Sequence, residues 1–146
     1  MKVERITEAH DALAEAVGRL VPQLSPNRKP AGIVELAELI ATQGTNLIVA
    51  REGDAVLGML TLIVYRVPTG IRAWIHDVVV DEAARGRGVG EALAREALRL
   101  AEDAGAISVE LTTRQEREAA NRLYRRLGFE QRETNVYVWR PNQVRT

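Results

Sequence analysis

A glycine-rich segment in the second half of the chain has the residue types of an anion-binding loop. It reads Arg85-Gly86-Arg87-Gly88-Val89-Gly90 and lies between an apolar run, Val78-Val79-Val80, and a segment with helical periodicity. A helix N-terminus presents unpaired N–H groups and the positive end of the helix dipole. Glycines let the backbone approach a ligand closely, and arginines form charge-assisted bonds with phosphate oxygens. The segment therefore predicts a site for the diphosphate of a phosphorylated cofactor.

Two common nucleotide-binding patterns do not fit this segment. The dinucleotide pattern Gly-x-Gly-x-x-Gly needs a third glycine where Glu91 stands, and no Gly-Lys-Ser/Thr follows as in a Walker loop. A kinase-like enzyme would also need a phosphate-contacting lysine in the loop and a set of magnesium carboxylates, neither of which is evident. The plain structural alternative is a strand-to-helix turn whose arginines are only solvated.

The composition of the 146-residue chain excludes several other classes of function. It contains no cysteine, which rules out a disulfide scaffold, a thiolate metal site and a cysteine nucleophile. With only two histidines, His10 and His76, we expect no metal site. The 20 basic and 20 acidic residues cancel, so we expect no nucleic-acid or membrane partner. Because we find no apolar signal core and no apolar run of membrane-spanning length, we expect a cytoplasmic protein.

Periodicity and turn residues predict the elements that position the loop. Strands are expected at Val3–Ile6, Leu47–Arg51, Ala55–Tyr65, Ile71–Val80 and Ile107–Thr112, with a final hairpin from Phe129–Glu133 and Val136–Arg140. Helices are expected after an N-cap at Thr7, at Ile33–Ala41, at Gly88–Ala104, and after the capping-box pattern of Thr113 to Glu116.

The predicted order is βααβββαβαββ, in one domain that covers residues 1–146. The fold class is therefore α+β, a mixed α/β architecture. We expect a mixed, mostly antiparallel sheet of six to seven strands flanked by four helices. The strand–helix–strand crossover from Val80 to Ile107 should be its parallel unit.

Two segments of the chain resemble motifs of one enzyme family. The pattern Arg-x-x-Gly-x-Gly, here Arg85 to Gly90 after Asp77-Val78-Val79-Val80-Asp81, resembles the acetyl-CoA motif of the GNAT N-acetyltransferases. The later segment Ala119 to Phe129 resembles the second motif of that family, which ends in Leu-Tyr-x-x-x-Gly-Phe. The resemblance covers about Val3 to Arg140 and is strong from Ile71 to Phe129. It implies a GNAT-like fold with the element order given above.

The resemblance also implies how acetyl-CoA binds. The pyrophosphate would lie on backbone amides of Arg85, Gly86, Arg87, Gly88, Val89 and Gly90. The pantetheine arm would pair with the main chain of Val78, Val79 and Val80, as a peptide does when it adds a strand to a sheet. This requires the strand that ends at Val80 to separate from the strand that begins at Ile107. Asn121 is a further candidate for a hydrogen bond to the cofactor.

The resemblance assigns catalytic roles as well. Tyr124 matches the general acid that protonates the departing thiolate, and a phenol and a thiol have ordinary pKa values of about 10 and 8.5. Tyr124 could instead be a core residue, because it shares an apolar helix face with Ala120 and Leu127. His76, Asp77 and Glu110 are the candidates for the base or for a carboxylate that holds a cationic amine. Since side chains alternate along a strand, His76 and Asp77 should point to opposite faces unless a bulge intervenes.

The expected activity is transfer of an acetyl group from acetyl-CoA to a primary amine by direct attack, without an acyl-enzyme. The acceptor, a small molecule or a protein, has no signature in the sequence. The alternative is a catalytically silent module that binds and senses acyl-CoA. A homodimer is a further expectation that one chain does not specify.

Overall fold

The computed structural model describes residues 1–142 and divides into two compact units, one from Met1 to Thr112 and one that starts at Thr113. The first unit contains a five-stranded sheet in the order β1-β2-β3-β4-β5. Its strands are β1 (Lys2–Arg5), β2 (Thr45–Glu52), β3 (Ala55–Val67), β4 (Gly70–Val80) and β5 (Val109–Leu111).

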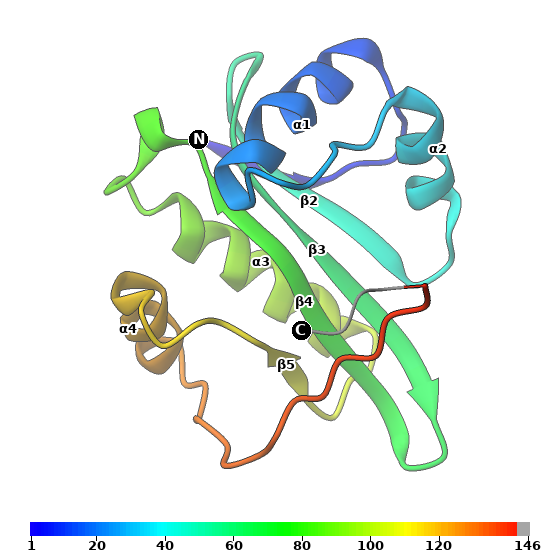
Figure 1. Cartoon of the computed structure of the whole chain (residues 1–146), viewed down its shortest axis with the longest axis vertical. Coiled ribbons are helices and arrows are strands. Elements are labelled where there is room, and N and C mark those ends of the chain that lie inside the picture. The colour runs from blue at the N-terminus through cyan, green and yellow to red at the C-terminus, as the bar shows by residue number, and fades with distance from the viewer. Residues whose placement is uncertain (143–146) are drawn as a thin grey trace. The chain divides into compact units, whose positions relative to one another are not determined.

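Neighbouring strands of the sheet run antiparallel, except that β4 and β5 run parallel (Figure 1). The helix α3 (Val89–Asp103) connects these two strands, preceded by a short 3-10 turn, η1 (Glu82–Ala84). A parallel pair needs such a crossover, whereas tight turns join the antiparallel pairs β2–β3 and β3–β4, and α1 and α2 lie between β1 and β2. The predicted parallel unit is therefore confirmed.

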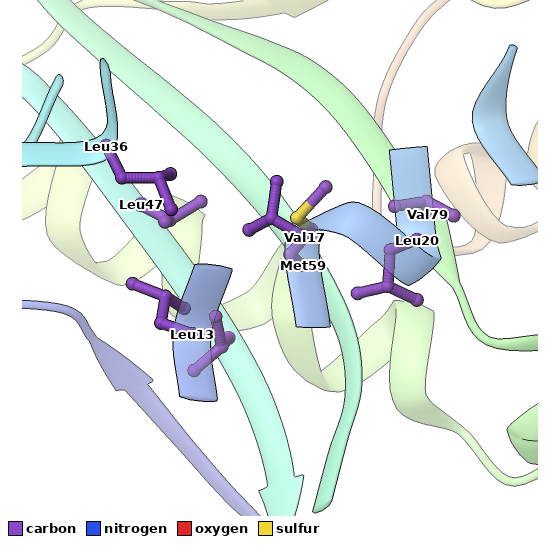
Figure 2. Packing of buried hydrophobic residues seen from close by; sticks show 8 residues of the cluster. Leu13, Val17, Leu20, Leu36, Leu47, Met59 and Val79 are labelled. Atoms are coloured by element: carbon purple, nitrogen blue, oxygen red, sulfur yellow. The ribbon is translucent and has the colours of Figure 1, made fainter. Parts of the chain in front are cut away.

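Helices cover both faces of the sheet in the first unit. On one face, α1 (Asp11–Leu24) and α2 (Ile33–Ala41) contribute Leu13, Val17, Leu20 and Leu36 to a cluster with Leu47, Val49, Met59 and Val79 (Figure 2). On the other face lies α3, because a Cβ atom built on Gly58 would come within 3.1 Å of Val89 and 3.2 Å of Leu93. Gly58 and Met59 are adjacent in β3, so they point to opposite faces.

Two helices begin later than predicted. The N-cap of α1 is His10, whose Nδ1 accepts a hydrogen bond from the Leu13 N–H at 3.1 Å, and Thr7 lies outside the helix. In the second unit, α4 (Glu118–Arg126) begins after a turn rather than at the predicted capping box. The side-chain amide of Asn121 donates to the carbonyl groups of Arg114 and Arg117, at 3.0 and 2.8 Å, and stabilises this turn.

The predicted final hairpin is wrong. Residues 129–142 contain no strand, so the sheet has five strands rather than six to seven. Four consecutive polar residues, Glu130 to Glu133, replace the alternation that a half-buried strand needs. The Thr134-Asn135 pair lacks the glycine that favours a two-residue hairpin turn, and an isolated hairpin is marginally stable in water. No helix within residues 1–142 is long and apolar enough to cross a bilayer.

Candidate active site

The loop between β4 and α3 has the backbone conformation that its glycines predict. Gly86 and Gly88 both have φ of 78°, in the left-handed region, and a Cβ atom on either would meet nothing within 4 Å. Gly88 is the N-cap of α3 and provides no side-chain cap, and the first helical bond runs from the Ala92 N–H to its carbonyl at 3.0 Å. Within the described residues, the N–H groups of Gly86 to Gly90 have no acceptor. The loop therefore offers unpaired donors beside open space.

The two arginines of the loop differ in their surroundings. The Arg87 guanidinium pairs with the carboxylate of Glu52, at the end of β2, and it lowers the pKa of Glu52. The Arg85 side chain is exposed and forms no ion pair within residues 1–142. Both side chains are therefore at the surface, where a phosphate group can reach them.

The edge of β4 beside the loop lacks a strand partner from His76 to the end of the strand at Val80, in the part of the chain that the structure describes. Only Ala73, Trp74 and Ile75 pair with β5, opposite Val109, Glu110 and Leu111. From His76 to Val80, no strand of the described chain pairs with this edge. The N–H of Asp81 donates to Leu57 of β3 at 2.8 Å, and successive N–H groups alternate between the two edges. The N–H of Val80 therefore points to the unpaired edge, as the predicted separation of the two strands requires.

A β-bulge interrupts β4 at the start of this edge. Thr61 pairs with His76 and Met59 with Val79, so β4 contains one more residue than β3 in this interval. Asp77 has φ of 53°, a left-handed conformation that is uncommon for residues other than glycine. Because of the bulge, His76 and Asp77 are both exposed, whereas strict alternation would place them on opposite faces.

Two of the three candidate bases share one face of the sheet. The ring of His76 stacks on that of Trp74, with centroids 6.0 Å apart and planes inclined by 29°. Trp74 is in turn the register partner of Glu110 on β5. Partners in adjacent strands have side chains on the same face, so His76 and Glu110 both lie on the face of Trp74.

In the second unit, Tyr124 is only 8% exposed and lies in the last turn of α4. Burial raises the pKa of its phenol, and the charge of Arg117 opposes this shift to a smaller extent. The Phe129 N–H donates to the Tyr124 carbonyl at 2.9 Å and the Gly128 N–H to that of Arg125 at 3.1 Å. This is a Schellman motif with Gly128 at φ of 97°, and it brings the Phe129 ring edge-on to Tyr124 at 5.6 Å.

Asn121 lies one turn before Tyr124, on the same helix. Because its two N–H donors serve the turn that precedes α4, only its carbonyl oxygen remains for a cofactor.

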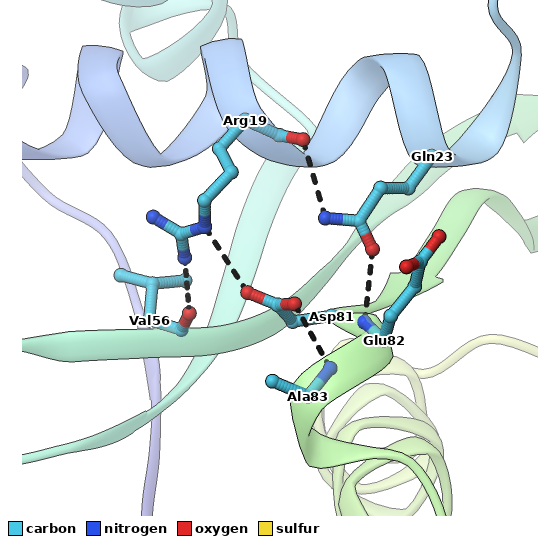
Figure 3. A network of polar contacts seen from close by, with 6 residues as sticks. All are labelled: Arg19, Gln23, Val56, Asp81, Glu82 and Ala83. Atoms are coloured by element: carbon cyan, nitrogen blue, oxygen red, sulfur yellow. Dashed lines mark hydrogen bonds and ion pairs between the residues drawn. The ribbon is translucent and has the colours of Figure 1, made fainter.

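Sequence reasoning did not single out Arg19 and Gln23 of α1, which contact the residues directly before the loop (Figure 3). Their spacing of four residues, which places them on one helix face, was the available signal. In the described part of the chain, no three His, Cys, Asp or Glu side chains are grouped to hold a metal ion.

The chain is similar to several known proteins. The chain is 44% identical over 61 residues to an uncharacterized N-acetyltransferase of Methanocaldococcus jannaschii, a match that spans 42% of this chain and 27% of that protein. A solved structure from Agrobacterium tumefaciens strain C58, provisionally described as an acetyltransferase, has a TM-score of 0.83 and 25% identity, covering 96% of this chain and 100% of that one.

A third protein, AAC(6′)-Iy bound to the bisubstrate analogue CoA-S-monomethyl-acetylneamine, has the same fold. Its TM-score is 0.78 at 16% identity, with 96% of this chain and 97% of that chain covered. A model of the acetyltransferase (GNAT) family matches residues 13–129, which is well over half of the sequence. The protein therefore belongs to the acetyltransferase (GNAT) family.

Proposed function

We propose that this protein is an N-acetyltransferase that uses acetyl-CoA to acetylate a primary amine. The observation that carries the proposal is the loop from Gly86 to Gly90 at the N-terminus of α3, which has unpaired N–H groups and open space at Gly86 and Gly88. Membership of the GNAT family supports the acyl-transfer chemistry.

The residues present fit coenzyme A at two places. The loop amides and the side chains of Arg85 and Arg87 suit a diphosphate, because backbone donors and guanidinium groups both bind phosphate oxygens. The unpaired edge of β4 suits the amide groups of a pantetheine arm, which can pair with the main chain of Val78 to Val80. The bisubstrate analogue held by AAC(6′)-Iy contains CoA, which is consistent with such a site in this fold.

Bound acetyl-CoA would supply a thioester, whose carbonyl carbon is open to attack by the amine nitrogen and whose thiolate is the leaving group. We propose that the Val80 N–H, on the unpaired edge, donates to the cofactor and helps to orient it. His76 is the proposed base that removes the proton of the amine, directly or through water, because it is exposed where the pairing with β5 ends. Asp77 and Glu110 are the other candidates for this role or for holding a cationic amine. Tyr124 is the proposed acid that gives its proton to the departing thiolate.

The loop is tested by calorimetric titration with CoA and with ATP. We expect CoA to bind more tightly than ATP. Gly88→Ala should weaken CoA binding about tenfold. Alanine at positive φ costs about 1–2 kcal/mol, so the free loop relaxes to another conformation, and restoring the binding conformation takes this free energy from CoA binding. Gly53→Ala is the matched control, because Gly53 also has positive φ and open space but lies in the β2–β3 turn. Tighter binding of ATP, or an unchanged affinity for CoA in Gly88→Ala, would contradict the proposal.

Turnover is tested with a panel of amines, including amino acids, polyamines, aminoglycosides and peptides, by following the release of free thiol. Acetylation of at least one primary amine is the expected result. Tight binding of acetyl-CoA without turnover on any amine would instead favour the sensing module.

A further inference from the structure

A polar network joins α1 to the residues that lead into the loop (Figure 3). The Arg19 guanidinium donates to Asp81 Oδ2 at 3.0 Å and to the carbonyl of Val56 at 2.7 Å. One turn further along α1, the Oε1 atom of Gln23 accepts a hydrogen bond from the Glu82 N–H at 2.9 Å. Two side chains of one helix thus hold two consecutive residues between β4 and the loop.

Asp81 connects this network to the backbone of the loop entrance. Its Oδ1 atom accepts from the Ala83 N–H at 3.2 Å, which caps η1, and its own N–H donates to Leu57 on β3 at 2.8 Å. Ala84, the last residue of η1, is 1% exposed. The hydrogen bond from Ala83, and then the bond from Arg19, lower the pKa of Asp81 against the opposing effect of burial and favour its charged form.

The backbone hydrogen bonds stop where the loop from Gly86 to Gly90 begins, and within this loop the Arg87 side chain pairs with Glu52. Past Arg85, the N–H groups of Gly86 to Gly90 have no acceptor in the described chain, and Gly86 and Gly88 lie beside open space. The direction in which these amides point therefore depends on the direction of the chain where it enters the loop and on the position of the first turn of α3. The network sets the direction of the chain at the start of the loop, because it holds Asp81 and Glu82 against both β3 and α1.

We propose that Arg19, Gln23 and Asp81 are positioning residues, which hold the loop so that its amides converge on the diphosphate of coenzyme A. The proposal rests on the function proposed above. None of the three is expected to touch the reacting atoms. Their loss should therefore weaken binding of ligands that carry the diphosphate and leave the acyl-transfer step unaffected.

The test compares acetyl-CoA with S-acetylpantetheine, a donor that lacks the diphosphate. Gln23→Met removes one hydrogen bond to the loop entrance and should raise the Kd of CoA about fivefold, and Arg19→Met removes two and should raise it at least as much. At saturating acetyl-CoA, kcat should stay within about twofold of wild type, and kcat/KM for S-acetylpantetheine should not change. In the cofactor-free protein, hydrogen exchange at the Glu82 amide should speed up in Gln23→Met.

Two further variants separate positioning from a general loss of stability. Arg19→Lys keeps a cation beside Asp81, so it should lose less affinity for CoA than Arg19→Met does. Arg99→Met, the matched control, removes an exposed arginine that is ion-paired within α3, and it should leave the Kd of CoA unchanged. An unchanged Kd of CoA in Gln23→Met and Arg19→Met would overturn this inference but not the proposed function. An equal loss of kcat/KM with both acyl donors would do the same. A wild-type protein that does not bind CoA would overturn it together with the proposed function.

Discussion

Tyr124 is the residue whose surroundings bear most directly on the proposed chemistry. A proton donor must hold its proton at working pH, and burial raises the pKa of this phenol above its ordinary value of about 10. The neutral phenol is thus favoured in the folded state. Its contribution to stability is fully present below about pH 10 and is lost as the pH rises through the folded-state pKa. The edge-on contact with Phe129 is the structural role that the same ring performs.

Tyr124→Phe separates these two roles, because phenylalanine keeps the ring and removes the proton. We expect kcat to fall about 10²- to 10⁴-fold, the usual contribution of a general acid, while the Kd of CoA stays the same. In the wild type, Tyr124 should cause no fall in kcat between about pH 7 and 9. The control is Tyr137→Phe, which removes an exposed phenol from the same unit. If Tyr124→Phe turns over as fast as the wild type, Tyr124 is a core residue and not the acid.

At the scale of elements, the bulge in β4 determines which side chains are exposed at the end of that strand. One extra residue between His76 and Val79 places His76 and Asp77 both at the surface while Val79 stays in the core. The bulge lies where pairing with β5 ends, so His76, the candidate base, lies at the start of the unpaired edge of β4. The bulge requires a left-handed residue, and aspartate tolerates that conformation better than most residues do.

Substitutions of Asp77 should distinguish its backbone role from its charge. Asp77→Asn keeps a side chain that tolerates positive φ, so the free energy of unfolding should change by less than about 0.5 kcal/mol. Asp77→Val places a β-branched residue there and should cost about 2 kcal/mol. Urea unfolding measures both, with the exposed β3 variant Arg66→Val as the control at an ordinary φ. Equal stabilities of the Val and Asn variants would show that the bulge is not strained.

If Asp77→Asn remains as active as the wild type, the carboxylate has no part in the reaction. A loss of turnover in Asp77→Asn at unchanged stability would instead place the charge of Asp77 in the reaction or in binding of the amine.

At the scale of the molecule, close packing in the first unit positions the loop. The helix α3 lies directly against β3 at Gly58, and its residues Val89 and Leu93 are buried there. Since the loop ends at the N-terminus of α3, this contact also sets where the loop amides stand relative to β4. The cluster of α1 and α2 on the opposite face supports the same strands (Figure 2).

Gly58→Ala should destabilise the protein because a Cβ atom there would lie 2.9 Å from the carbonyl oxygen of Val79, which is backbone and cannot rotate away. We expect a loss of about 1–3 kcal/mol in the free energy of unfolding by urea titration, as for other overpacked sites. Gly18→Ala is the matched control: Gly18 is inside α1 with nothing within 4 Å of the new methyl group. It should gain about 0.5–1 kcal/mol. A Gly58→Ala variant as stable as Gly18→Ala would contradict this account of the packing.

The sequence by itself determined the elements that depend on local periodicity and local turn residues. The helix Ile33–Ala41 has the predicted bounds, α3 differs by one residue at each end, and the parallel crossover lies where it was expected. The positive φ of Gly86 and Gly88 follows from residue type, because few other residues adopt it. The prediction of the final hairpin was wrong because a strand is stable only when it pairs with others, and the local sequence of Phe129 to Arg140 does not determine such pairing.

Only the tertiary structure decided the bulge at Asp77, the end of pairing at Ile75 and the network that joins α1 to Asp81. The bulge depends on the count of residues in β4 relative to β3, and the network joins residues 62 positions apart. Neither leaves a periodic trace in the chain, because such contacts arise only when the folded backbone brings distant segments within hydrogen-bonding distance.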